Sequence, residues 1–241
     1  MTSRQKIIIL LVVVLAALLY FAPKMPSEQK QEDKEDFDFI ASFEEAQKSL
    51  SSDQKNIFDR AEQSLKKAQA DDNEQSWLAS ANDFLKGARL IQGDKKAVLY
   101  KGAINGFEKT LEFNSDNLSA KTNLGTAIVE SSSLLGNQPM KGITLLREVI
   151  QKDSNNIEAN LQLGVFSVTS QQFDKAIERF QRILRIDSTH IDMYVYLGDT
   201  YLTMGEKQKA IASYENYKTR AKDTLIIKDI DEYIKKLKNQ P

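Results

Sequence analysis

The chain has 241 residues, with 33 basic and 34 acidic side chains, a formal net charge of −1, one histidine and no cysteine. This balance excludes a bulk attraction to nucleic acid or to acidic substrates. The lack of cysteine excludes disulfides, thiolate metal sites and a cysteine nucleophile. Four prolines and ten glycines favour long helices joined by short turns.

The first predicted element is an apolar helix over residues 7–22, IIILLVVVLAALLYFA, which carries no charge. At about 1.5 Å per residue it is about 24 Å long, and bilayer thinning or snorkelling of flanking lysines would fit it to a core of about 30 Å. Two interpretations are open, a retained signal anchor and a cleaved signal peptide. Cleavage after Ala22 places Tyr20 at the −3 position and Pro23 just past the cut, which is unfavourable. We therefore expect a membrane anchor over residues 1–22.

The basic residues around this segment set its expected orientation. Arg4 and Lys6 precede it and Lys24 follows closely, so the positive-inside bias towards a cytoplasmic N-terminus is modest. It predicts a single-pass membrane protein whose body lies on the far side of the membrane, in the periplasm if the source is bacterial. Residues 23–36 have many charges and almost no apolar side chains, and we expect a disordered charged linker there.

Two stretches near the C-terminus, residues 157–190 and 191–224, repeat each other at a spacing of 34 residues. The residues that coincide include large and small side chains: Leu163 with Leu197, Gly164 with Gly198, Ala176 with Ala210, and Phe180 with Tyr214. A fixed period of this size is typical of a solenoid, in which one helical hairpin is copied and stacked. The small residues predict positions where the two helices of a hairpin approach closely.

These units resemble tetratricopeptide repeats, which are helix–turn–helix units of this period. The resemblance is strongest over 157–224 and extends back over 118–156, where Leu124 and Gly125 keep the register and Gly142 replaces the family's usual alanine. That unit carries a loop insertion around 132–141, and residues 37–117 are expected to be a degenerate helical region of the same kind. The resemblance implies an all-α fold, an α-solenoid of stacked antiparallel helix hairpins in a right-handed superhelix, here preceded by one transmembrane helix.

The last predicted element, residues 225–241, is an amphipathic helix that caps the open end of the solenoid. Ile226, Ile230, Tyr233 and Leu237 form an apolar stripe, which Ile227 and Ile234 widen on one side. Charged side chains form the other face. An open-ended solenoid requires such a cap for solubility. The alternative, a helix lying on a membrane surface, requires a larger and more basic polar face.

The sequence offers no set of residues for catalysis or for metal binding. The one histidine, His190, falls at the turn between two units and has no cysteine to join it in a closed metal site. There is no G-x-x-x-x-G-K-[ST] loop and no G-x-G-x-x-G after a strand. We therefore predict that the protein is not an enzyme and binds no cofactor.

Tetratricopeptide arrays line a concave groove with the first helix of each unit, and the resemblance implies the same here. The expected protein-binding groove consists of Asn123, Thr126, Glu158, Leu161, Gln162, Val165, Asp192, Val195, Tyr196 and Asp199. Some family members hold a terminal carboxylate with lysine, arginine and asparagine in these rows. Only Asn123 is of that kind, so no carboxylate clamp is expected. The groove is mildly acidic and suits a peptide with some positive charge; the alternative is that these residues are merely solvated helix faces.

Together these features predict a membrane-tethered adaptor that binds a protein or peptide partner and helps to assemble or hold envelope proteins in a chaperone-like way. Bacterial proteins of similar layout include an accessory factor at the secretory translocon and assembly factors in cytochrome c maturation. Two other interpretations stay open, a structural element of the envelope that associates with itself, and an organellar receptor that faces the cytosol. The partner and the oligomeric state are left open by the sequence.

Overall fold

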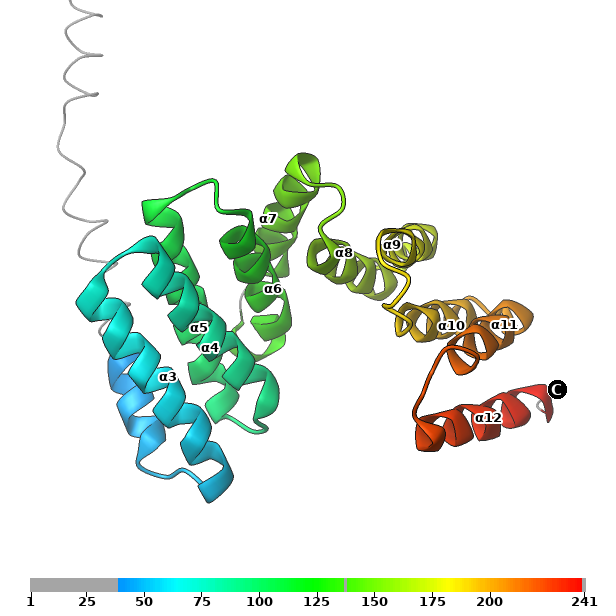
Figure 1. Ribbon diagram of the computed structural model, residues 1–241, viewed down its shortest axis with the longest axis horizontal. Helices are drawn as coiled ribbons and strands as arrows, with labels where there is room; N and C mark the ends of the chain where they lie inside the picture. The colour runs from blue at the N-terminus through cyan, green and yellow to red at the C-terminus, as the bar shows by residue number, and fades with distance from the viewer. Residues whose placement is uncertain (1–38, 137, 240–241) are drawn as a thin grey trace, which may run out of the picture. The chain divides into compact units, whose positions relative to one another are not determined.

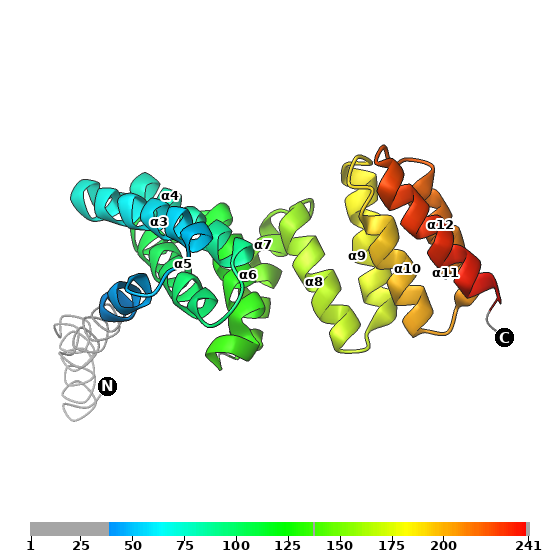
Figure 2. The same cartoon turned by 90° about the horizontal axis from the view of Figure 1, so that it is seen from below.

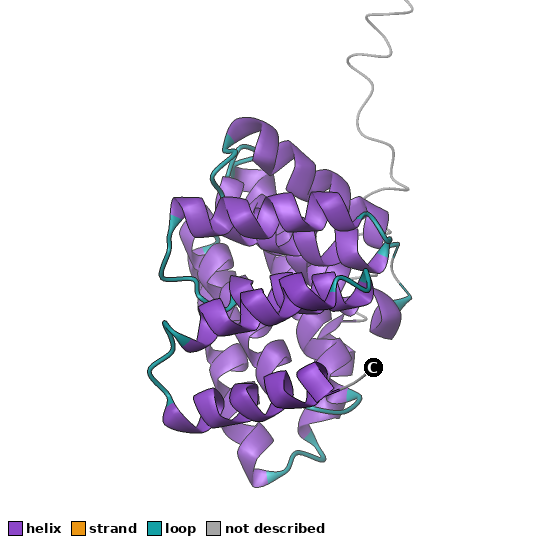
Figure 3. Ribbon diagram, turned by 90° about the vertical axis from the view of Figure 1, so that its right-hand side faces the viewer, coloured by secondary structure: helices purple, strands orange, loops and turns teal. Residues whose placement is uncertain are grey.

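The computed structural model describes residues 39–136 and 138–239, which contain helices and turns and no strand (Figure 3). The chain divides into two parts, residues 1–55 and 56–241. In the first part the described residues form a helix over 39–47 and the start of the next helix. Within that part, the rings of Phe39 and Phe43 lie one helical turn apart, with their centroids separated by 6.0 Å.

The second part is a series of helices joined by short turns (Figure 1). The division falls within α3, whose first residues belong to the first part. The helices are α3 (Ser52–Asp71), α4 (Glu74–Leu90), α5 (Lys95–Phe113), α6 (Leu118–Leu135), α7 (Pro139–Lys152), α8 (Ile157–Thr169), α9 (Phe173–Ile186), α10 (Met193–Thr203), α11 (Lys207–Lys218) and α12 (Thr224–Asn239). From α4 onward the most extensive contacts are within the pairs α4–α5, α6–α7, α8–α9 and α10–α11. Each pair also packs against the next helix along the chain (Figure 2). The prediction of an all-α solenoid of stacked helical hairpins is therefore confirmed, while its right-handed twist stays a prediction.

An aromatic ring lies directly on a glycine in three of these hairpins: α4–α5, where Phe84 lies on Gly102, α8–α9 and α10–α11. A Cβ atom added to Gly164 of α8 would lie 2.6 Å from Cε1 of Phe180, and one added to Gly198 of α10 would lie 2.5 Å from Cε1 of Tyr214. Both rings are almost completely buried. The paired glycine and aromatic positions of the two repeats are thus the crossing point of the two helices in each hairpin.

In the hairpin of α6 and α7 the two helices approach closely at two glycines that face each other. A Cβ atom on Gly142 would lie 2.5 Å from the carbonyl oxygen of Gly125, and one on Gly125 would lie 2.9 Å from the carbonyl oxygen of Gly142. Backbone atoms cannot rotate away as a side chain can. This explains why glycine stands at 142, where the family usually has alanine.

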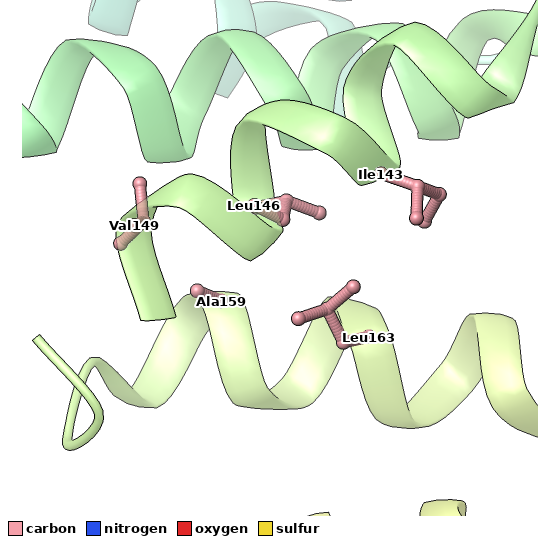
Figure 4. Packing of buried hydrophobic residues seen from close by; sticks show 5 residues of the cluster. All are labelled: Ile143, Leu146, Val149, Ala159 and Leu163. Carbon is pink, nitrogen blue, oxygen red and sulfur yellow. The ribbon is translucent and has the colours of Figure 1, made fainter. Parts of the chain in front are cut away.

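Apolar side chains at the junctions between hairpins form the core. Figure 4 shows one such cluster, in which Ile143, Leu146 and Val149 of α7 meet Ala159 and Leu163 of α8. Further clusters join α9 to α10 and α11 to α12. Each cluster joins neighbouring hairpins, or the last hairpin to α12, so a hairpin taken alone would expose one side of its core.

The last helix, α12, packs against α11 with side chains from one edge of the predicted apolar stripe. Ile234 and Leu237 are buried, whereas Ile226 and Tyr233 are 41% and 40% exposed. The ring of Tyr233 packs edge-on against Tyr214, with centroids 5.4 Å apart. The buried edge is therefore displaced from the centre of the stripe that the sequence predicts.

No helix within residues 39–136 and 138–239 is both long enough and apolar enough to cross a membrane. Most of these helices are shorter than the roughly 20 residues that a span requires, and they carry charged side chains. The prediction of a single-pass membrane protein, with its C-terminal body on the far side or in the periplasm, is corrected by this finding. The predicted anchor over residues 1–22 and the linker over 23–36 lie outside the described residues.

We expect Gly164→Leu to destabilise the fold, because the added side chain would have to occupy the space of the Phe180 ring. Overpacking of this kind lowers the free energy of unfolding by about 1–3 kcal/mol. Urea denaturation followed by circular dichroism would measure it. Ala212→Leu, on the exposed side of α11, is the matched control and should change little. An unchanged midpoint for Gly164→Leu would show that the crossing is not a constraint.

Candidate protein-binding face

The first helices of three successive hairpins, α4, α6 and α8, are neighbours, because α4 contacts α6 and α6 contacts α8. Asn123 of α6 donates a hydrogen bond from Nδ2 to Oδ1 of Asn82 in α4, at 2.8 Å. We refer to the surface formed by α4, α6, α8 and α10 as the first-helix face. It is the surface on which the sequence places the groove.

The carboxylate of Glu130 in α6 is the centre of a polar network on this face. Arg89 of α4 donates to it twice, from Nε at 3.1 Å and from Nη2 at 2.9 Å. The hydroxyl of Tyr100 donates at 3.1 Å and Nε2 of Gln162 at 3.3 Å. One carboxylate therefore binds side chains from α4, α5 and α8.

Arg89 extends the network to a second carboxylate, that of Glu158 in α8. Its Nη2 lies 3.2 Å from Oε1 of Glu158, and Gln162 donates to the same oxygen at 3.1 Å. We call Arg89, Tyr100, Glu130, Glu158 and Gln162 the Glu130 network. Through this network Arg89 contacts Glu158, which lies 69 positions further along the chain.

The charges of the network perturb two of its members. Burial alone would lower the pKa of Arg89, but its hydrogen bonds to Glu130 and Glu158 and their charges outweigh burial, so the pKa lies above its usual value. Burial, and then the charge of Glu130, raise the pKa of Tyr100 above its ordinary range. Both side chains therefore keep the proton with which they hold the carboxylates.

The network also shows what the sequence analysis missed. The predicted groove contains no arginine, because it begins at Asn123 and takes no residues from the helices before residue 118. The contacts Asn82–Asn123 and Arg89–Glu130 share one offset of 41 residues. Aligning α4 with α6 at that offset was the signal that could have placed Arg89 on this face.

Four of the predicted groove residues lie largely in the packing between helices. Thr126 is completely buried, and its hydroxyl has no hydrogen-bond partner among the described residues. Leu161 and Val165 pack against the core cluster between α9 and α10, and Val195 packs against the cluster between α11 and α12. These side chains help to position the first helices and offer little surface of their own.

Three other predicted residues are exposed along α10 and the turn before it. Asp192, Tyr196 and Asp199 are spaced at four and three residues, which places them on one side of a helix. Tyr196 is 38% exposed and stacks on Phe180, with ring centroids 5.2 Å apart. Asp199 accepts a hydrogen bond of 2.6 Å from the hydroxyl of Tyr214. We call Asp192, Tyr196 and Asp199 the α10 patch.

The first-helix face can form further hydrogen bonds without losing its own. Side chains of Arg89 and Glu158 are 43% and 36% exposed, and within the described residues Nη1 of Arg89 and Oε2 of Glu158 have no partner. The described residues contain no group of three or more His, Asp or Glu side chains that could hold a metal ion. The chemistry that this face offers is charge-assisted hydrogen bonding to a guest.

Residues 191–224 match the family model of the tetratricopeptide repeat, so this repeat is confirmed for the last hairpin. The general transcriptional corepressor trfA of Dictyostelium discoideum is 31% identical over 75 residues. That match covers 31% of this chain but only 5% of the length of the corepressor.

Solved structures similar to this chain include those of MamA and YrrB. A crystal structure of the MamA protein is 24% identical, with a TM-score of 0.48, over 65% of this chain and 84% of that one. A crystal structure of YrrB, described as a TPR protein with an unusual peptide-binding site, is 20% identical with a TM-score of 0.46. It covers 71% of this chain and 99% of YrrB.

We expect Glu130→Gln to destabilise the fold by about 1–3 kcal/mol, because the amide would turn a donor towards donors that now have a carboxylate. Urea denaturation at neutral pH would measure the change. Glu112→Gln is the matched control, since Glu112 is 51% exposed and pairs only with a neighbour on its own helix, Lys109. Equal small effects for both variants would show that the network contributes nothing to stability.

We also expect stability to fall at alkaline pH, in part through Tyr214. Burial first, and then the hydrogen bond to Asp199, raise the pKa of its hydroxyl above the usual value. From about pH 9.5 upward the unfolded chain loses this proton while the folded chain keeps it, so the free energy of unfolding decreases with pH. Urea titrations between about pH 8 and pH 11 should give a shallower decline for Tyr214→Phe. An identical slope would contradict the assignment.

Proposed function

We propose that this protein is a scaffold without enzymatic activity, which binds a segment of another protein along the first-helix face. The observation that carries the proposal is the Glu130 network, in which Arg89, Glu130 and Glu158 place partly exposed side chains from three successive first helices side by side. Arg89 and Glu158 each keep a hydrogen-bonding atom without a partner within the described residues. Such a row suits the main chain and polar side chains of an extended or helical guest.

The network favours binding because it is organised before a guest arrives. Two hydrogen bonds from Arg89 to one carboxylate fix the plane of its guanidinium group. A guest would then bind side chains that have already lost their rotamer freedom, which reduces the entropic cost of association. A loose arginine on an open helix face would not have this advantage.

The charges of the face favour a guest with basic residues. Glu130, Glu158, Asp192 and Asp199 supply four carboxylates, while the contacts of these residues include one arginine, Arg89. The exposed ring of Tyr196, backed by Phe180, adds a rigid aromatic surface that suits apolar or cationic side chains. We infer a guest with alternating basic and apolar residues, which the scaffold assembles with other components or holds.

Site-specific crosslinking tests this function. A photoreactive benzoylphenylalanine at Tyr196 should capture a protein guest in cells. The same probe at Phe113, which is 49% exposed at the end of α5, should not capture it. Glu158→Gln together with Asp192→Asn should weaken capture at Tyr196, because both changes remove negative charge from the face without disturbing the buried core.

Two outcomes would contradict the proposal. Equal capture from Tyr196 and Phe113, or capture that ignores the two charge changes, would show that the face is not the binding surface. A crosslink to a second copy of this chain alone would show self-association instead of guest binding.

A further inference from the structure

Three arginines form a second charged surface, on the second helices of two hairpins. Arg147 belongs to α7, and Arg179 and Arg182 belong to α9. Arg179 is only partly exposed and donates from Nη1 to Oδ1 of Asn160, at 3.0 Å. Arg182 donates from Nη1 to the carbonyl oxygen of Ser154, at 3.2 Å. We call Arg147, Arg179 and Arg182 the arginine surface.

No carboxylate of the described part of the chain is in direct contact with the arginine surface, although the charge of Glu178 acts on Arg179. Among the described residues no carboxylate oxygen lies within 4.0 Å of these three guanidinium groups. By contrast, Arg60 and Arg89 have carboxylate oxygens at 2.8 and 2.9 Å. Burial, together with the positive charges of Arg182 and Arg147, lowers the pKa of Arg179, against an opposing influence from Glu178. A partly buried charge without a counter-ion is costly, so the fold maintains this one at the expense of stability.

The two repeats differ at the position of Arg179. At the spacing of 34 residues Asn160 corresponds to Tyr194, and Arg179 corresponds to Ser213. The later repeat thus has a large ring on its first helix and a small buried serine on its second. The earlier repeat has the smaller Asn160 on its first helix and the larger, charged Arg179 on its second, and the two side chains are in contact.

The buried partner of Arg179 is itself fixed. Asn160 has no exposed surface, and its Nδ2 donates to the carbonyl oxygens of Ser154 at 3.0 Å and Asn156 at 2.8 Å. These bonds direct Oδ1 towards Arg179. The guanidinium group is therefore oriented by the interior of the hairpin and uses one of its five N–H donors there.

We propose that the arginine surface docks an acidic segment of a partner protein, whose carboxylates supply the missing counter-charges. Guanidinium groups bind carboxylates through two parallel hydrogen bonds, and they are well suited to partly buried ion pairs. Three arginines on a chain with net charge −1 are too few for a nucleic acid, whose binding proteins commonly make about 6–10 phosphate contacts. This docking surface lies on second helices and does not depend on the function proposed for the first-helix face.

Fluorescence anisotropy with the full chain and a labelled 12-residue peptide, glutamate at every second position, tests the proposal. Arg179→Gln and Arg182→Gln should each weaken binding about tenfold, as expected for the loss of one charge-assisted contact. Arg60→Gln is the matched control, because it makes the same charge change at a residue already paired with Asp83. It should leave the affinity within about twofold. A peptide with lysine in place of glutamate should not bind in an Arg182-dependent way.

Circular dichroism would confirm that each variant is folded. Arg179→Gln could prove unstable because it leaves Asn160 without its partner. In that case Arg182→Gln alone tests the proposal, since Arg182 contacts a main-chain carbonyl and, among the described residues, no buried side chain depends on it. A folded Arg182→Gln protein with unchanged affinity would overturn the proposal. So would displacement of the peptide by inorganic phosphate but not by sodium chloride at equal ionic strength, which would indicate a small-oxyanion site. Tighter, Arg182-dependent binding of a DNA duplex would overturn it as well.

Discussion

The close approach of two helices within each hairpin is the constraint on which the other features depend. At Gly164 and Gly198 the partner helix contributes a buried aromatic ring that occupies the place of a side chain. At Gly142 the neighbouring atom is a carbonyl oxygen of the backbone, which cannot rotate away as a side chain can. Each contact fixes the distance and rotation of a helix pair. It thereby decides which side chains of the first helix enter the core and which stay at the surface.

The first-helix face follows from this arrangement, repeated along the chain. Because each of α4, α6 and α8 packs closely against its partner helix, these first helices lie next to one another and their polar rows meet. Arg89 can then contact Glu130 and Glu158, which belong to different hairpins. The network joins the stacked hairpins and presents an organised polar surface, so the proposed binding would use the same side chains that link the hairpins.

The two surfaces differ in how their charges are balanced. On the first-helix face Arg89 is compensated by two carboxylates, and the remaining charge is negative. On the second helices Arg179 and Arg182 are held by a neutral amide and a main-chain carbonyl, and within the described residues no carboxylate oxygen lies within 4.0 Å of them. A scaffold with faces of opposite charge can hold two partners of different composition without competition between them.

The period of 34 residues, the helical hairpins and the glycine crossings could be predicted from the sequence, because these features rest on contacts inside one hairpin and recur at the same spacing. Predictions for single surface positions were less complete. Thr126 was expected to line the groove but is completely buried, since its exposure depends on how neighbouring hairpins stack.

The contact of Arg89 with Glu158, and the lack, in the described part of the chain, of a carboxylate in contact with the Arg179 guanidinium group, were decided by the tertiary structure alone. Residues 69 positions apart come into contact only after three hairpins have been placed. No local pattern encodes the sum of the turns and crossing contacts between them. The sequence by itself therefore determined the repeating element, and the stacking of the hairpins determined which charges face each other.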